Sequence, residues 1–218
     1  MEKAIKIIIK LIEQLKTLRY SKGGSNLKIG VVDMAEKYTA EIVPLNAEKI
    51  GTKAHGTAEF TVDGAQLRIH IEMFDTPANV QHWEHFHGFP DGKPAEIATA
   101  AQDANGDGFV DLPETEPVSG TTMVPFDAEP AKMHVPNDSY PVADADGHYA
   151  YDKLVDLKEL QKAFKAAFGS EDLQLDKRVV YIHGVPDSLE LPDTVKGTVM
   201  NYDAHVTLPI AVGKIVRA

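Results

Sequence analysis

Hydrophobic and polar residues alternate along several short segments of the chain. Leu67, Ile69, Ile71 and Met73 share one parity, and the residues between them are polar. Because successive side chains of a strand point to opposite faces, this pattern predicts a strand with one buried face. Similar runs, rich in Val, Ile, Thr, Phe and Tyr, recur from residue 27 onward, and the sequence VDGA at 62–65 predicts a tight hairpin. The sequence therefore predicts a mainly β protein, folded as a β-sandwich.

Two segments interrupt the strand pattern with a period typical of helices. Residues 93–102 carry a proline where a first helical turn accepts one. Residues 157–168 carry an apolar stripe at helical spacing, between a capping Asp156 and a closing Gly169. We therefore expect two short helical inserts in the β-sandwich.

The first residues have a different pattern from the rest of the chain. Isoleucine and leucine recur at 3-4-3 spacing between Ile5 and Leu15, and a linker-like SKGGS follows. The sequence thus predicts an amphipathic helix and linker at 1–26 and a β domain at 27–218. This helix either packs on its own domain, joins copies into a homo-oligomer, or is an engineered fusion. The lysines within it interrupt the apolar stretch that a secretory signal peptide needs, so none is predicted in this chain.

Composition removes several classes of function. The chain has 218 residues and a formal net charge of −11, and such a surface repels nucleic acid. It contains no cysteine, which excludes disulfides, zinc fingers and thiol catalysis. It contains no apolar run of about 18 residues, the length that a membrane span requires.

Candidate chemistry begins with the sequence QHWEHFHGF at 81–89, which holds three of the nine histidines. In a strand, His85 and His87 point to the same face, whereas His82 faces the other side unless a bulge or turn intervenes. His183 stands at the end of another predicted strand. Three imidazoles suit copper or zinc. The alternative is a set of exposed strand histidines without a metal.

A second candidate is the acidic sequence DANGDGFVDLPE at 103–114, which has the spacing of a calcium loop. Gly108 occupies the sharp-turn position, and two prolines make a regular helix after the loop unlikely on sequence grounds. One structural calcium ion would order this insert; the alternative is a solvated acidic turn. The predicted calcium ligands are Asp103, Asn105, Asp107, the Phe109 carbonyl, Asp111 and Glu114.

These motifs resemble two groups of known proteins. The sequences HFHGF, RVVYIHGV and LPIAVGKI resemble strands of copper-zinc superoxide dismutases. The chain from about residue 38 onward is still more similar to bacterial chordin-like (CHRD) domain proteins, with AEIVPLN, GTAEFTV and IHGV at corresponding places. The resemblance implies a Greek-key β-sandwich of superoxide dismutase type and an extracellular or periplasmic location. It also implies that His85, His87 and His183 occupy positions of dismutase copper ligands.

The sequence also departs from the dismutase pattern. It has no counterpart of the histidine that bridges copper and zinc, and His134, Asp146 and His148 do not reproduce the spacing of the zinc loop. The arginine that guides superoxide would fall near Pro209, where no arginine stands. Two functions of different class therefore remain: an extracellular metal-binding module without turnover, and a copper-dependent dismutase-like enzyme.

The resemblance leads to a specific expectation for the histidines. We expect His85, His87 and His183 to lie together, with His82 as the fourth member if the chain bends before Glu84. The second ring nitrogens should be held by carbonyl or carboxylate oxygens, for which Glu84 is a local candidate. Because ligand imidazoles must be neutral, metal affinity should fall as the pH drops through about 6.5.

Overall fold

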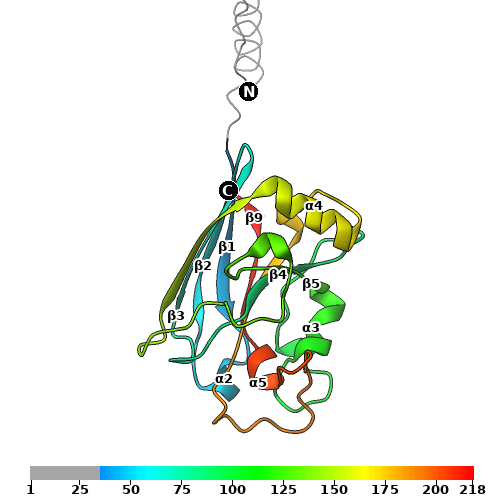
Figure 1. Ribbon diagram of the computed structural model, residues 1–218. Helices are drawn as coiled ribbons and strands as arrows, with labels where there is room; N and C mark the ends of the chain where they lie inside the picture. Colours follow the sequence, from blue (N-terminus) through cyan, green and yellow to red (C-terminus); the bar gives the residue numbers. More distant parts are fainter. Residues whose placement is uncertain (1–34) are drawn as a thin grey trace, which may run out of the picture. The chain divides into compact units, whose positions relative to one another are not determined.

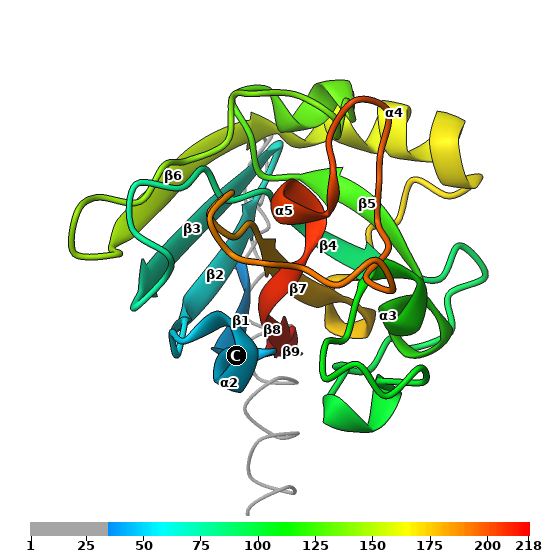
Figure 2. The ribbon, with the colours of Figure 1, turned by 90° about the horizontal axis from the view of Figure 1, so that it is seen from below.

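Antiparallel strands build the domain, as Figures 1 and 2 show. The computed structural model describes residues 35–218, so the predictions made for 1–26 lie outside the described residues. Within that range the strands are β1 (Glu36–Pro44), β2 (His55–Asp63), β3 (Gln66–Phe74), β4 (Glu84–Gly88), β5 (Thr121–Pro125), β6 (Tyr149–Asp156), β7 (Val179–His183), β8 (Pro209–Lys214) and β9 (Val216–Arg217).

The order of the strands in space differs from their order along the chain. It runs β5-β4-β7-β8-β1-β2-β3-β6, and β9 pairs with β1. After β3 the chain crosses to the other half of the fold for β4 and β5, returns to pair β6 with β3, and crosses again to pair β7 with β4. Such returns past intervening strands are Greek-key connections. The predicted mainly β, Greek-key β-sandwich is confirmed.

The core lies between the two halves of the sheet. Leu67, Ile69, Ile71 and Met73 of β3 are all fully buried, as their shared parity predicted. From the other half, Phe86 of β4 contributes to the same hydrophobic core. The opposite face of β4 is therefore free to carry other chemistry.

Within residues 35–218, four short α-helices and three 3-10 turns connect the strands. Helix α4 begins after Asp156, whose carboxylate accepts hydrogen bonds from the N–H groups of Lys158 and Glu159, and ends at Gly169 in the left-handed conformation. Both predicted ends are confirmed. No helix of the described range is long and apolar enough to cross a membrane. The α-helices are α2 (Ala47–Ile50), α3 (Leu112–Ser119), α4 (Leu157–Phe168) and α5 (Ala204–Thr207), and the 3-10 turns are Ala100–Gln102, Pro130–Lys132 and Leu175–Lys177.

Two helix predictions were wrong. Residues 93–102 form only the single 3-10 turn at Ala100–Gln102 instead of a helix. Conversely, α3 forms although it contains two prolines. Pro113 lies in the first turn, where a missing N–H costs no helical hydrogen bond, and Asp111 and Glu114 form a reciprocal capping box at the start of the helix. The capping box stabilises a helix that Pro117 alone disfavours.

Candidate metal centre

Neighbouring strands bring three of the predicted ligands together. His85 and His87 lie on β4, and His183 ends the antiparallel neighbour β7. The His183 N–H donates to the carbonyl of Trp83, so His183 stands across from the residue that precedes β4. Strand parity then places all three imidazoles on the face of β4 that points away from Phe86.

Irregular pairing occurs at two of these histidines. The register between β4 and β5 shifts at Phe86/His87, and the register between β7 and β8 shifts at Ile182/His183. Bulges of this kind change the direction of a side chain relative to a regular ladder. Both shifts lie beside the histidine group, where they set the directions of His87 and His183.

The three imidazoles are close enough to share one ion. One ring nitrogen from each of His85, His87 and His183 lies within 4.8 Å of the others. Nε2 of His87 is 3.1 Å from Nδ1 of His85, and the ring centres of His85 and His183 are 4.6 Å apart. In residues 35–218 this is the only group of three or more His, Asp or Glu side chains with such convergence.

Backbone carbonyls fix which nitrogen of two rings can bind a metal. Nδ1 of His183 lies 2.7 Å from the carbonyl oxygen of Thr207, and Nδ1 of His87 lies 3.3 Å from that of Gly120. Because a carbonyl oxygen only accepts hydrogen bonds, both Nδ1 atoms carry the proton and both Nε2 atoms present a lone pair. Nε2 of His183 is buried and has no hydrogen-bond partner. That lone pair is directed at nothing in the protein, which is the state a metal ligand requires.

Burial keeps all three rings neutral. Their side chains are at most 3% exposed. Burial lowers the pKa of His87 to about 3 and that of His183 to about 4, and it holds the pKa of His85 well below its ordinary value, with further lowering from His183 and His87. A neutral imidazole is the metal-binding form. The group is thus ready to bind copper or zinc, which accept nitrogen ligands, but not a hard ion such as calcium.

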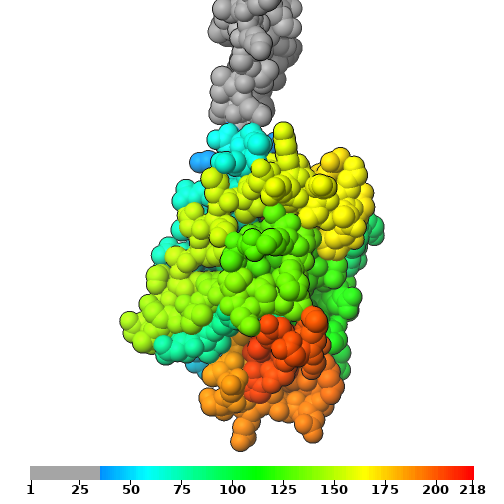
Figure 3. Space-filling view, viewed as in Figure 1, coloured from blue at the N-terminus to red at the C-terminus, as the bar shows by residue number. Residues whose placement is uncertain are grey.

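A small cavity adjoins the histidines. It has a volume of about 30 Å³ and is lined by Trp83, His85, Leu112, Thr122, Val135, His183, Val199 and Thr207. A wider hollow of about 340 Å³, lined in part by His87, shares Leu112, Thr122 and Val199 with it. The cavity and the hollow therefore adjoin each other at these three residues. Figure 3 shows the segment that follows β7, in orange, against the green segments that follow β4.

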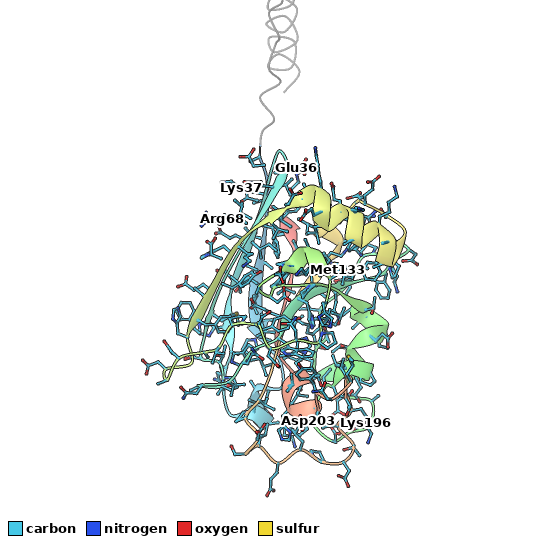
Figure 4. The ribbon with its side chains drawn as sticks, in the orientation of Figure 1. Glu36, Lys37, Arg68, Met133, Lys196 and Asp203 are labelled. Carbon is cyan, nitrogen blue, oxygen red and sulfur yellow. The ribbon has the colours of Figure 1, made fainter. Side chains whose placement is uncertain are left out.

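The surroundings of the cavity carry little positive charge. Among the described residues, neither lining contains a lysine or arginine, and Glu116 in the wider hollow is its one carboxylate. Figure 4 places Arg68 at the opposite end of the domain from Lys196 and Asp203. Arg68 is paired there with Asp152. Among the described residues, the linings of the cavity and the hollow therefore offer no cation to attract an incoming anion.

His82, expected as the fourth member if the chain bends before Glu84, lies apart from the group, and Glu84 does not hold a second ring nitrogen. Nδ1 of His82 lies 2.9 Å from the carbonyl oxygen of His183, and its Nε2 lies 3.1 Å from that of Pro77. Glu84 has the parity of Phe86 and accepts a hydrogen bond of 2.9 Å from the hydroxyl of Tyr149. The second ring nitrogens of His87 and His183 are held by the main-chain carbonyls of Gly120 and Thr207. Glu84 had been the expected local partner for these nitrogens.

The acidic loop closes on itself through hydrogen bonds. The carboxylate of Asp103 accepts from the N–H groups of Gly106 and Gly108, and that of Glu114 accepts from Ala104, Asn105 and Asp111. The side chains of Asn105 and Asp107 accept from the N–H groups of Asp107 and Phe109. Asp111 caps α3 and also accepts from the N–H of Lys196. The loop carboxylates thus bind backbone groups, and the predicted calcium site stays a prediction.

Several residues of the site were not predicted. Thr122 places its hydroxyl 3.1 Å from Nε2 of His87, and Tyr181 packs its ring 4.7 Å from that of His87. Trp83 shares the parity of His85 and His87, so strand periodicity could have placed it on this face. The carbonyls of Gly120 and Thr207 come from distant segments, and a main-chain group leaves no trace in the residue pattern.

Comparisons with known proteins add a likeness of fold. No protein-family model matches the sequence, and no curated protein matches it. A mutant of an SOD-like protein from Bacillus subtilis is similar in structure, with 15% identity and a TM-score of 0.41, over 82% of this chain and 97% of that one. The Cu/Zn superoxide dismutase from Brucella abortus is similar with 16% identity and a TM-score of 0.40, over 82% of this chain and 99% of that one. At these identities no residue role is carried across.

Proposed function

We propose that the domain binds one copper or zinc ion through His85, His87 and His183 and serves as a metal-holding module without turnover. The observation that carries the proposal is the buried Nε2 of His183, which has no partner and lies within 4.8 Å of ring nitrogens of the other two histidines. Leaving a buried polar atom without a partner costs about 1–3 kcal/mol. An ion at this place would remove that cost.

A holding function is favoured over dismutation by the charge around the site. Turnover of an anionic substrate gains from a positive approach path, and the linings of the cavity and hollow offer only Glu116 as a formal charge. The alternative, a copper-dependent dismutase-like enzyme, is supported by the position that three ligands leave open on the ion. Superoxide consumption by the copper-loaded protein, compared with that by free copper, distinguishes the two.

Metal content after dialysis tests the proposed site. The wild-type protein should retain about one equivalent of copper or zinc against a weak chelator, and His183→Ala should lower the affinity by more than about 100-fold, because it removes a ligand where loss of an outer-shell partner alone costs about 10- to 100-fold. The control is His55→Ala, which removes an exposed histidine paired with Asp75. Equal retention by wild type and His183→Ala, or none by wild type, contradicts the proposal.

Two further parts of the proposal come from the sequence. The resemblance to CHRD domain proteins supports a place outside the cytoplasm, which cell fractionation of the native producer tests. The spacing of Asp103, Asn105, Asp107 and Glu114 supports one structural calcium ion in the acidic loop. The return of Glu114 to the N–H groups of Ala104 and Asn105 supports it as well, since it brings the last position of the motif against the second and third.

A further inference from the structure

Trp83 has an indole N–H without an acceptor. Its side chain is 2% exposed, and Nε1 is one of the few buried side-chain polar atoms of the described range that have no hydrogen-bond partner. Tyr140 stacks on the indole at 5.4 Å and the edge of Tyr202 meets it at 4.7 Å. Packing therefore holds the indole ring in place, while its N–H group donates no hydrogen bond.

A second unpartnered atom, Nε2 of His183, belongs to another residue that lines the small cavity, and it is an acceptor. Trp83 and His183 line the same cavity of about 30 Å³, and Nε2 of His183 also lacks a partner. The two needs are opposite: the indole N–H requires a lone pair, and the imidazole Nε2 requires a proton or a cation. A metal ion alone satisfies the imidazole but not the N–H, because both the ion and the hydrogen are electropositive.

We infer that the metal site takes a second, small ligand that accepts a hydrogen bond, and that Trp83 positions this ligand. The inference rests on the proposed function. A water-sized ligand needs roughly 10–15 Å³ of such space, so a cavity of about 30 Å³ has room for an ion and one such ligand. Larger organic ligands are excluded by volume.

One other side chain of the cavity lining becomes available as a donor when the ion binds. The hydroxyl of Thr122 lies 3.1 Å from Nε2 of His87, and it loses that acceptor once the nitrogen binds the ion, whereas the hydroxyl of Thr207 donates to the carbonyl of Gly197. No lysine or arginine contributes to the lining among the described residues. Trp83 is thus the one side chain of this lining whose donor has no acceptor in the protein, and its N–H favours a ligand that accepts a hydrogen bond.

Fluoride is a suitable probe because it is a single atom that only accepts hydrogen bonds. The full-length protein is loaded with one equivalent of copper(II), and fluoride binding is followed by the copper(II) electron paramagnetic resonance spectrum. Trp83→Phe keeps an aromatic ring but removes the N–H. Replacement of Trp83 by benzothienylalanine keeps the size of the indole and also removes the N–H, so a defect shared by both variants is not one of packing.

Both variants should take up copper as the wild type does and bind fluoride about 10-fold more weakly, the effect of losing one hydrogen bond to a charged acceptor. The matched control is Tyr140→Phe, which touches the same indole but removes a hydroxyl bonded to the carbonyl of Val135. Normal copper uptake with fluoride affinity within twofold of wild type in both variants overturns the inference alone. Failure of the wild-type protein to take up copper overturns the proposed function, and the inference with it.

Discussion

At the scale of single residues, the two faces of β4 carry opposite chemistry. His85 lines the cavity and His87 the wider hollow, while Glu84 and Phe86 point into the core. Glu84 is fully buried, and one of its oxygens has no partner. Burial raises the pKa of Glu84 well above its ordinary value, although the bond from Tyr149 opposes this. Burial away from water therefore favours the neutral, protonated form of the Glu84 carboxyl group.

Glu84→Gln should therefore stabilise the protein at alkaline pH. The folded state keeps a proton on Glu84 that the unfolded state releases above about pH 4.5, so the wild-type free energy of unfolding falls as the pH rises from there toward the folded pKa. Glutamine keeps an acceptor for Tyr149 and has no proton to lose. Urea unfolding at pH 8 should show a gain of about 1 kcal/mol or more, shrinking toward pH 4.5. The exposed control Glu59→Gln should show no such pH-dependent gain; a less stable Glu84→Gln at pH 8 would refute the argument.

The residues of the site were predictable where they obey a strand period. The parity of His85 and His87 placed them on one face, and the resemblance added His183. His82 was open to two interpretations because it precedes β4, where no period applies. Its ring nitrogens face two carbonyl oxygens, one of them that of His183 itself. Which carbonyl lies near which ring is decided by the packing of distant loops, and residue types do not record it.

At the scale of elements, the acidic loop and α3 share residues. Asp111 and Glu114 have the spacing of a calcium loop and also form the capping box of α3. Their spacing predicted only the calcium ligands, and the two prolines of this segment argued against a helix that in fact forms. The segments of β1, β2, β3, β7, β8 and α4 were predicted because each has its own hydrophobic period, whereas those of β5 and β6 were not singled out. In residues 93–102 the buried side chains are the small Ala95 and Ala98, which offer a helix little apolar surface.

The predicted calcium ion is best tested at a residue that takes no part in the cap. Asp103→Ala removes the first position of the loop and leaves Asp111 and Glu114 intact. If calcium binds, it should stabilise the wild-type protein by about 2.7 kcal/mol at 100 times its dissociation constant, and Asp103→Ala should abolish the rise in melting temperature. Asp146→Asn, in another acidic turn, is the control. A wild-type melting temperature that is the same with calcium and with chelator shows that the loop is a solvated turn.

At the scale of the whole molecule, burial changes how acid acts on the metal and on folding. The folded pKa values of about 3 for His87 and about 4 for His183 lie below the ordinary value of 6.5. Between these limits the unfolded chain binds protons that the folded one does not, so this contribution to stability is complete above about pH 6.5 and is lost as the pH falls toward 4. Protons would likewise compete with a metal ion for the ring nitrogens only when the pH approaches these lowered pKa values of about 3 and about 4.

The loaded protein should therefore hold its ion well below pH 6.5, where ordinary imidazoles release it. We expect half-release nearer pH 4, measured as free metal after filtration at steps from pH 7 to pH 3.5. A peptide with exposed histidines, loaded with the same ion, is the control and should release it at higher pH. Half-release from the protein between pH 6 and pH 6.5 would contradict the effect of burial.

The burial of the histidine group also has a consequence in time. Leu112, Thr122 and Val199 lie where the cavity meets the hollow that His87 lines, and the three histidines are at most 3% exposed. Once β4, β7 and the segments over them have folded, an ion bound by these buried rings would enter or leave when those segments open locally. Exchange would then be slow compared with binding to an open chain. The ion that a molecule holds would reflect the metal supply in the place where that molecule folded.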